Sequence, residues 1–324
     1  MTLRTLIPAA LLALLLALPL GAAAEGRLYV SSEDDDVVVV FDAESLERLA
    51  QIPTSERPRA LKLSADGSRL YAASGDADAI DVIDTEKLEV IRQLDVGEDP
   101  EMFDIDPMGR YLYASNEDDG LLTIYDLVED RIAAQVAVGE EPEGVLVSPD
   151  GSRAYVTSEV ANMVHVVDTA SRDLVANVLV DNRPRRFAVP DGRAELWVTN
   201  ELSGTVSIID TESYEVIGGI SFEPEGFRPD DVTPVGLVMT ADGATAYVTL
   251  GRANHVAVVD VTSREITDYV LVGRRAWGVA LSRDESRLYV ANGGSDDMSV
   301  VDTASLRVLR SVPVARKPHS IVVE

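Results

Sequence analysis

Eight residues of this 324-residue chain combine the charges and aromatic rings that bind an ionised ligand. An arginine holds a carboxylate by two parallel hydrogen bonds, aromatic side chains supply flat contact surfaces, and a glutamate orients a cationic group. The candidate binding residues are Glu101, Glu143, Arg185, Arg186, Arg228, Arg274, Trp277 and His319. This set predicts a binding site for a partner protein or a small molecule.

Catalytic arrangements are harder to find. The chain has no cysteine, and its three histidines lie too far apart in the repeat pattern described below to suggest one metal centre. The sequence contains no Gly-x-Ser-x-Gly elbow, no phosphate-binding glycine loop and no zinc-binding helix. We therefore predict no catalytic residue, no metal site and no cofactor. Glu101 and Glu143 acting as an acid–base pair remain the enzymatic alternative.

One short pattern recurs seven times and must position these residues. Five of the six spacings between its aromatic residues are 42 residues, and an aspartate follows each aromatic by thirteen positions. The aromatic residues are Tyr29, Tyr71, Tyr113, Tyr155, Trp197, Tyr247 and Tyr289. Periods of about 40 to 45 residues built from short strands are typical of propeller blades. The sequence therefore predicts an all-β, seven-bladed β-propeller.

Each repeat divides into four short apolar runs separated by turn residues. In the copy between Pro58 and Pro100 we expect strands at 60–64, 70–73, 79–83 and 88–96. The Asp66-Gly67 turn joins the first two, and Asp84 is expected to cap the turn after the third. Four such antiparallel strands form one blade. The third runs are almost entirely apolar because both faces of a blade are covered by its neighbours.

The two ends of the chain complement each other. The first copy lacks its first strand and begins at Arg27, whereas residues 318–323 form a first strand with nothing after it. The terminal segment is in register with the first copy. We therefore expect the two ends to share one blade and to close the ring.

Residues 1–24 have the pattern of a cleavable signal peptide. Arg4 precedes an apolar run from Leu6 to Leu20, and an alanine-rich cleavage site ends at Ala24. The run is shorter than the ~20 residues of a spanning helix, which disfavours a membrane anchor. We predict export to a bacterial periplasm and a single propeller domain over residues 25–324, because the repeat leaves no linker.

The repeat is interrupted once, between Trp197 and Tyr247, where eight extra residues fall near 222–231. Insertions in repeat proteins often lie on the binding face. Two phenylalanines in this loop, Phe222 and Phe227, either cover the mouth of the channel or pack locally, and the sequence does not choose between these alternatives.

The chain is strongly acidic, with 56 Asp and Glu against 28 Lys and Arg and a net charge of −28. This charge disfavours nucleic acid and anionic membranes and attracts cationic partners, although it is also typical of adaptation to salt. On one propeller face the connecting loops are acidic early in the chain and basic later. Their charged residues include Glu98, Asp99, Glu101, Glu140, Glu141 and Glu143, then Arg183, Arg185, Arg186, Arg274, Arg275, Arg316 and Lys317. We expect a mouth with acidic and basic sides.

Several motifs resemble a known family. The tetrads Tyr155-Val156-Thr157-Ser158, Trp197-Val198-Thr199-Asn200 and Tyr289-Val290-Ala291-Asn292 are similar to the YVTN-type propeller repeat. The segments at 99–103, 141–144, 162–165, 183–187 and 271–277 resemble PQQ-dependent catabolism-associated β-propeller proteins. The resemblance covers all of residues 25–324. It implies a periplasmic protein that accompanies PQQ-dependent alcohol oxidation, with PQQ entering as an association rather than as a bound cofactor.

These observations favour a non-enzymatic periplasmic propeller that binds a partner protein or a small ligand, with a component of a PQQ-dependent alcohol dehydrogenase system as the partner that the resemblance implies. The alternative is a propeller enzyme, such as a lactonase acting on an oxidised sugar or alcohol product.

Overall fold

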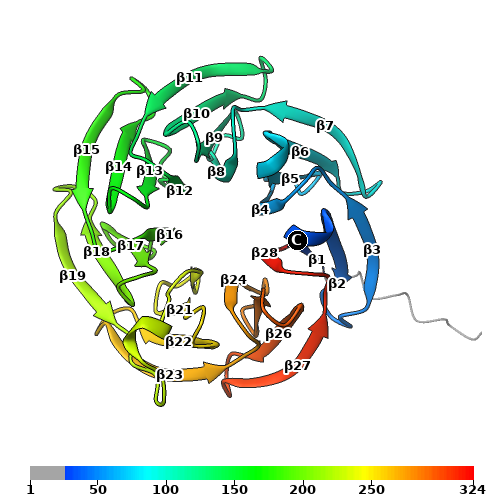
Figure 1. The fold of residues 1–324 in the computed structure, drawn as a ribbon, viewed down its shortest axis with the longest axis vertical. Coiled ribbons are helices and arrows are strands. Elements are labelled where there is room, and N and C mark those ends of the chain that lie inside the picture. Colours follow the sequence, from blue (N-terminus) through cyan, green and yellow to red (C-terminus); the bar gives the residue numbers. More distant parts are fainter. Residues whose placement is uncertain (1–25) are drawn as a thin grey trace, which may run out of the picture.

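The computed structural model describes residues 26–324 as seven four-stranded antiparallel sheets arranged as blades around a central axis (Figure 1). The seven-bladed β-propeller predicted from the repeats is therefore confirmed. We number the blades from the sheet that contains β1, so that blade 2 begins with β4 and blade 7 with β24. The predicted signal peptide lies outside the described residues.

Each blade contributes one strand to each of four concentric positions. The innermost strands, in blade order, are β28 (Pro318–Val323), β4 (Pro58–Leu63), β8 (Pro100–Ile105), β12 (Pro142–Val147), β16 (Pro184–Ala188), β20 (Leu237–Met239) and β24 (Ala276–Leu281). The second strands are β1 (Arg27–Ser32), β5 (Arg69–Ser74), β9 (Tyr111–Asn116), β13 (Arg153–Ser158), β17 (Glu195–Asn200), β21 (Thr245–Thr249) and β25 (Arg287–Asn292).

The third strands are β2 (Val37–Asp42), β6 (Ala79–Asp84), β10 (Leu121–Asp126), β14 (Met163–Asp168), β18 (Thr205–Asp210), β22 (His255–Asp260) and β26 (Asp297–Asp302). The outer strands are β3 (Arg48–Pro53), β7 (Glu89–Asp95), β11 (Arg131–Ala137), β15 (Leu174–Leu179), β19 (Val216–Ser221), β23 (Glu265–Leu271) and β27 (Arg307–Pro313). Short 3₁₀ turns occur at η1 (Glu33–Asp35), η2 (Gly75–Ala77) and η3 (Pro229–Asp231). No helix in the described part of the chain is long and apolar enough to cross a membrane.

The ends of the chain meet in blade 1, as the sequence predicts. Strand β28 pairs with β1 in antiparallel register, with Val322 opposite Tyr29 and Ile321 opposite Val30. In Figure 1 the red terminal strand lies beside the blue first strand. This pairing gives blade 1 its fourth strand and leaves no blade incomplete.

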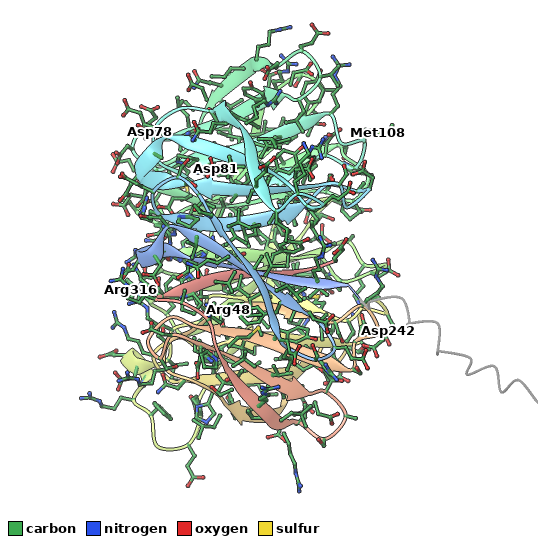
Figure 2. The ribbon with its side chains drawn as sticks, turned by 90° about the vertical axis from the view of Figure 1, so that its right-hand side faces the viewer. Arg48, Asp78, Asp81, Met108, Asp242 and Arg316 are labelled. Atoms are coloured by element: carbon green, nitrogen blue, oxygen red, sulfur yellow. The ribbon has the colours of Figure 1, made fainter. Side chains whose placement is uncertain are left out.

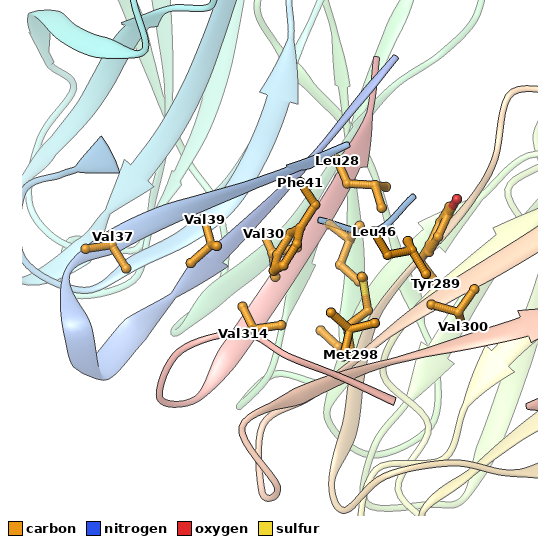
Figure 3. Packing of buried hydrophobic residues seen from close by; sticks show 13 residues of the cluster. Leu28, Val30, Val37, Val39, Phe41, Leu46, Tyr289, Met298, Val300 and Val314 are labelled. Carbon is orange, nitrogen blue, oxygen red and sulfur yellow. The ribbon is translucent and has the colours of Figure 1, made fainter. Parts of the chain in front are cut away.

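Apolar side chains fill the spaces between neighbouring blades. Between blades 7 and 1, Phe41 and Val39 pack against Tyr289 and Met298 (Figure 3), and all four side chains are buried. Burying a large apolar side chain contributes about 1.5–3 kcal/mol. Because blades cover both faces of each third strand, β2 and β6 are buried along almost their whole length. This burial explains their continuous apolar sequence.

The repeated aspartates cap turns, as expected. The Oδ1 atom of Asp84 accepts hydrogen bonds from the backbone N–H groups of Glu86 and Lys87, at 3.1 and 3.0 Å. Asp210 does the same in blade 5 with Glu212 and Ser213, at 3.1 and 2.7 Å. These short-range bonds fix the connection from the third to the outer strand.

The loops that could form a site gather on one face. Loops between second and third strands hydrogen-bond to the loops that enter the innermost strands, for example from the Gly75 N–H to the Arg57 carbonyl at 3.2 Å. Figure 2 shows Asp78 and Arg316, one from each kind of loop, on one side of the disc and Met108 and Asp242 on the other. We call the side of Asp78 and Arg316 the upper face.

Candidate functional site

Seven equivalent residues at the start of the innermost strands form a ring around the upper end of the channel. The channel ring consists of Arg59, Glu101, Glu143, Arg185, Val235, Trp277 and His319. Their spacing is 42 residues, apart from the step that contains the insertion. None is more than 9% exposed. One residue from each blade therefore determines the chemistry of the channel at this level.

A turn that recurs before the innermost strands positions the residues of the channel ring. The residue two positions earlier has left-handed backbone in six blades, as in Arg57 (φ 56°) and Arg275 (φ 55°). A side chain of the preceding blade accepts the N–H of that residue: Asp36 accepts from Arg57 and Asn254 from Arg275, both at 2.9 Å. Acidic loop residues such as Asp36 thus hold backbone in place, and not all of the acidity of the upper face is free to bind a partner.

Hydroxyl groups on the second strands connect the ring residues of adjacent blades. The Thr249 hydroxyl accepts a hydrogen bond from the Gly236 N–H and donates one to the carbonyl of Trp277 in the next blade, both at 2.7 Å. Ser115 donates to the Glu143 carbonyl in the same way, at 2.6 Å. The innermost strands approach so closely that a Cβ atom on Gly278 would collide with the His319 carbonyl.

The channel ring and the loops above it line a pocket of about 290 Å³. Its lining includes seven cationic side chains but only four carboxylates. The cations are Arg57, Arg59, Arg183, Arg185, Arg252, Arg275 and Lys317, and the carboxylates are Glu33, Glu117, Glu143 and Glu201. A protein that is acidic as a whole thus has a locally cationic pocket.

Ion pairs neutralise most of the charged side chains that are buried around the pocket. Glu101 pairs with Arg59 and, at 3.0 Å, with Arg57. Glu143 contacts Arg186 at 2.7 Å and Arg185 at 3.7 Å. Burial alone would raise the pKa of Glu143, but Arg185, Arg186 and Arg59 together hold it far below its usual value. Burial lowers the pKa of Arg186 to about 10, which leaves the pair charged at neutral pH.

His319 is neutral at neutral pH. Its burial, reinforced by Arg59 and Arg186, lowers its pKa well below the ordinary value. The Nε2 atom lies 3.4 Å from the Arg59 Nε donor, so its lone pair faces a guanidinium and the proton resides on Nδ1. This tautomer lacks a free basic nitrogen, which makes His319 a poor general base.

Trp277 forms one wall of the pocket. The guanidinium of Arg275 lies 4.8 Å from the centre of its ring system, and that of Arg185 lies 5.1 Å away. The His319 ring is tilted against it at 5.8 Å. Trp277 thus orients two of the cations that line the pocket.

A different electrostatic environment surrounds Asp99 and Glu117. Burial raises the pKa of both carboxyl groups, and the nearby carboxylate of Glu143 adds to the shift at Glu117. Oxygen atoms of Asp99, Glu101 and Glu117 lie within 4.8 Å of one another, a spacing that would suit a cation. Glu101 is already bound by two arginines.

The pocket brings together part of the predicted residue set. Glu143, Arg185, Trp277 and His319 line it, and Glu101 and Arg186 are ion-paired to residues that line it. Arg274 and Arg228 lie outside it.

The Arg228 side chain is 87% exposed and bonds to Asp231, 3.3 Å away, because the insertion folds outward over blade 6. Phe222 is buried there and Phe227 packs on His255 at 5.3 Å, so both phenylalanines are occupied locally.

Sequence reasoning missed three arginines of the pocket: Arg57, Arg59 and Arg252. Arg59 stands 42 residues before Glu101, so the repeat period contained the signal that places it in the channel ring. Arg252 belongs to a loop between second and third strands, and only the folded structure shows how far that loop reaches toward the channel.

Comparisons with known proteins agree with this architecture. Residues 73–195 match the family model described as the cytochrome D1 heme domain, which is little more than a third of the chain. No curated protein matches the sequence. Among solved structures, the periplasmic gluconolactonase PpgL of Pseudomonas aeruginosa is 21% identical, with a TM-score of 0.78 over 92% of this chain and 98% of that chain.

Two further structures are similar. The dihydro-heme d1 dehydrogenase NirN in complex with DHE is 18% identical, with a TM-score of 0.71 over 94% of this chain and 76% of that chain. Hydrazine synthase of Kuenenia stuttgartiensis is 20% identical, with a TM-score of 0.78 over 87% of this chain and 93% of that chain. At these identities the likeness establishes the propeller fold alone.

Proposed function

We propose that the protein is an exported, non-enzymatic binding protein that holds a small organic anion in the upper mouth of its channel. One observation carries the proposal: the pocket is lined by seven cations and four carboxylates, in a chain whose net charge is −28. Charges in a partly buried site are screened less than charges on the surface, so the local excess governs what the pocket retains.

The state of the pocket's ionisable groups supports binding over catalysis. The carboxylate of Glu143 is a weak base because three arginines depress its pKa. His319 directs its basic nitrogen toward Arg59. Neither group is placed to accept a proton from a substrate near neutral pH. Glu143 favours the charged form of Arg186, and His319 accepts a hydrogen bond that holds Arg59 in position.

The sequence resemblance supports a role in PQQ-dependent alcohol oxidation in the periplasm. PQQ and the acids produced by alcohol oxidation are carboxylates, so both belong to the class of ligand that the pocket favours. A partner protein of such a system would use the same contacts if it inserted an acidic side chain into the mouth.

A lactonase is the second candidate, and one feature favours it. Glu117 lines the pocket, and its raised pKa brings it nearer to the range of a general acid or base. The propeller folds of PpgL and of a protein from Bacteroides uniformis described as a putative 6-phosphogluconolactonase, 18% identical, are consistent with such an activity. Lactone hydrolysis lost on the change Glu117→Gln would favour this enzyme over a binding protein.

Thermal shift with purified protein tests the proposed function. A ligand at about 100 times its Kd stabilises the folded state by about 2.7 kcal/mol, so PQQ or a cognate organic acid should raise the Tm measurably. Trp277→Leu should abolish the rise, and Arg228→Gln, outside the pocket, should preserve it. The proposal fails if no organic anion raises the Tm, or if the rise survives Trp277→Leu.

A further inference from the structure

The seven cations of the pocket fall into two groups. Five of them form ion pairs with carboxylates of the protein: Arg57, Arg59, Arg183, Arg185 and Lys317. Arg183 contacts Glu159 at 2.6 Å, and Lys317 contacts Glu33 at 2.6 Å. Within residues 26–324, Arg252 and Arg275 make no salt bridge. Both side chains are exposed to the pocket opening.

Arg252 and Arg275 are neighbours in space. An antiparallel bridge joins Gly251 to Ala276, so Arg252 and Arg275 lie on adjoining backbone segments, and both side chains line the same pocket. Two guanidinium groups that line one pocket repel each other, and an anion bound between them offsets that repulsion. In a chain with twice as many acids as bases, this unneutralised pair stands out.

The backbone of the pair is fixed before any ligand arrives. Thr233 accepts a hydrogen bond from the Arg252 N–H, and Asn254 accepts one from the Arg275 N–H, both at 2.9 Å. The Arg275 guanidinium also stacks over Trp277. Pre-positioned donors lose less entropy on binding, which favours a specific contact over a transient one.

The opposite side of the pocket offers a hydrogen-bond acceptor. Glu117 follows β9 in blade 3, across the channel from blades 6 and 7 (Figure 1). Its carboxylate lines the same pocket and makes no salt bridge within residues 26–324. A second carboxylate on the ligand would be repelled there. A ligand ammonium group would add a positive charge to a pocket whose cations already outnumber its carboxylates, so hydroxyl donors suit this side best.

We propose that Arg252 and Arg275 form a carboxylate subsite and that the ligand is a compact, hydroxylated carboxylic acid whose hydroxyl groups reach toward Glu117. This inference rests on the proposed function, because it names the chemistry of the ligand for the same pocket. A volume of about 290 Å³ lies near the small end of the range of ligand pockets, which favours a short-chain acid over a large cofactor.

Isothermal titration calorimetry with four compounds of equal carbon-chain length tests the inference. Gluconate carries a carboxylate and hydroxyls, hexanoate only the carboxylate, sorbitol only hydroxyls, and 6-aminohexanoate a carboxylate and an ammonium group. We expect gluconate to bind at least about tenfold more tightly than each of the others, because only gluconate satisfies both sides of the pocket.

Matched variants locate the subsite. Arg252→Gln/Arg275→Gln should weaken gluconate binding by about tenfold or more, because two charge-assisted contacts are lost. Arg274→Gln changes an exposed arginine next to Arg275 that lies outside the pocket, and it should leave the affinity within about twofold. Quenching of Trp277 fluorescence, compared with a Trp277→Phe control, measures occupancy of the pocket independently of the calorimetric signal.

The outcomes separate the two proposals. Equal gluconate affinity in wild type and in the double variant overturns the subsite, as does hexanoate, sorbitol or 6-aminohexanoate binding as tightly as gluconate. If gluconate does not bind but PQQ or another organic anion does, the hydroxy-acid inference is wrong and the proposed function stands. If no organic anion binds the wild type, both fail together.

Discussion

The Thr249 hydroxyl lies 2.7 Å from the carbonyl oxygen of Trp277 and donates a hydrogen bond to it across the boundary between blades 6 and 7. The Thr249 hydroxyl oxygen also accepts a hydrogen bond from the Gly236 N–H within its own blade. All of these groups are buried, so one hydroxyl satisfies two backbone atoms that water cannot reach. This hydrogen bond fixes the position of the Trp277 backbone, and with it the indole ring that lines the pocket, relative to blade 6.

Replacing Thr249 by valine should therefore destabilise the fold. The change preserves shape but leaves a buried N–H and a buried carbonyl without partners, at a cost of about 1–3 kcal/mol for each such group. Thr249→Ser should remain close to wild type, because Ser31 and Ser115 make the corresponding bond in blades 1 and 3. Urea unfolding measures the difference. Equal midpoints for Thr249→Val and wild type would contradict the role of this hydroxyl.

Deleting residues 316–324 should disrupt the ring. The deletion removes β28, exposes the edge of β1, and takes Ile321 out of the packing between blades 7 and 1. Unpaired strand edges and exposed apolar surface promote aggregation. We expect insoluble protein or a far lower Tm, measured by sedimentation and differential scanning calorimetry. An unchanged Tm would show that the pairing of the termini contributes nothing to stability.

Arg186 stabilises the folded protein and also lies next to the pocket. The structure places Arg186 in a largely buried ion pair with Glu143 at 2.7 Å, so a change at this position affects stability as well as binding. Breaking a buried pair costs about 3–5 kcal/mol when the partner charge is left behind.

Arg186→Met should therefore lower stability by about 3 kcal/mol, toward the low end because Arg185 and Arg59 still face Glu143. Arg186→Met/Glu143→Gln should recover part of the loss, since it removes the stranded carboxylate. Chemical denaturation measures the free energies of unfolding of the two variants and of wild type. A double variant less stable than Arg186→Met would contradict this explanation.

Acid should weaken the turns on the lower face in a defined window. The Ser148 hydroxyl and the Ser152 N–H lower the pKa of Asp150 from 3.8 to about 2, and Asp66 and Asp284 are shifted in the same way by equivalent serines. A carboxyl whose folded-state pKa is depressed favours folding above its unfolded pKa. Stability from these turns is thus present above about pH 4 and is lost as the pH falls toward about 2.

A triple variant, Asp66→Asn/Asp150→Asn/Asp284→Asn, tests this window, because an amide oxygen accepts the same hydrogen bonds without titrating. Its Tm should fall less steeply than that of wild type between pH 4 and pH 2. Identical slopes would mean that other carboxylates dominate acid unfolding.

The sequence was sufficient to predict the ring of blades but not the contacts that form the pocket. The 42-residue period places Glu101, Glu143 and Trp277 at equivalent positions, and periodicity specifies strand register because each blade repeats the same pairing. Ion pairing is not periodic. Whether Arg186 faces solvent or Glu143 depends on contacts between blades that no single repeat contains.

Arg228 lies outside the pocket for a related reason. The insertion breaks the period, so no register assigns its residues to the channel, and local packing of Phe222 and Phe227 turns the loop outward. Arg252 follows Gly251, whose bridge to Ala276 joins a loop of blade 6 to the first residue of β24 in blade 7. Such contacts arise only when the blades are assembled.

Closure of the ring by the last strand also governs how this chain can fold. Strand β28 pairs with β1 across almost the full length of the sequence, so blade 1 cannot be completed until the final residues are available. Pairings between such distant segments raise the contact order and slow folding. Six blades can form as the chain lengthens, while β1 keeps an open edge to the end. The interval before closure is the period of greatest risk for misassembly, and a factor that shields β1 would speed recovery of native protein more than one acting on any later blade.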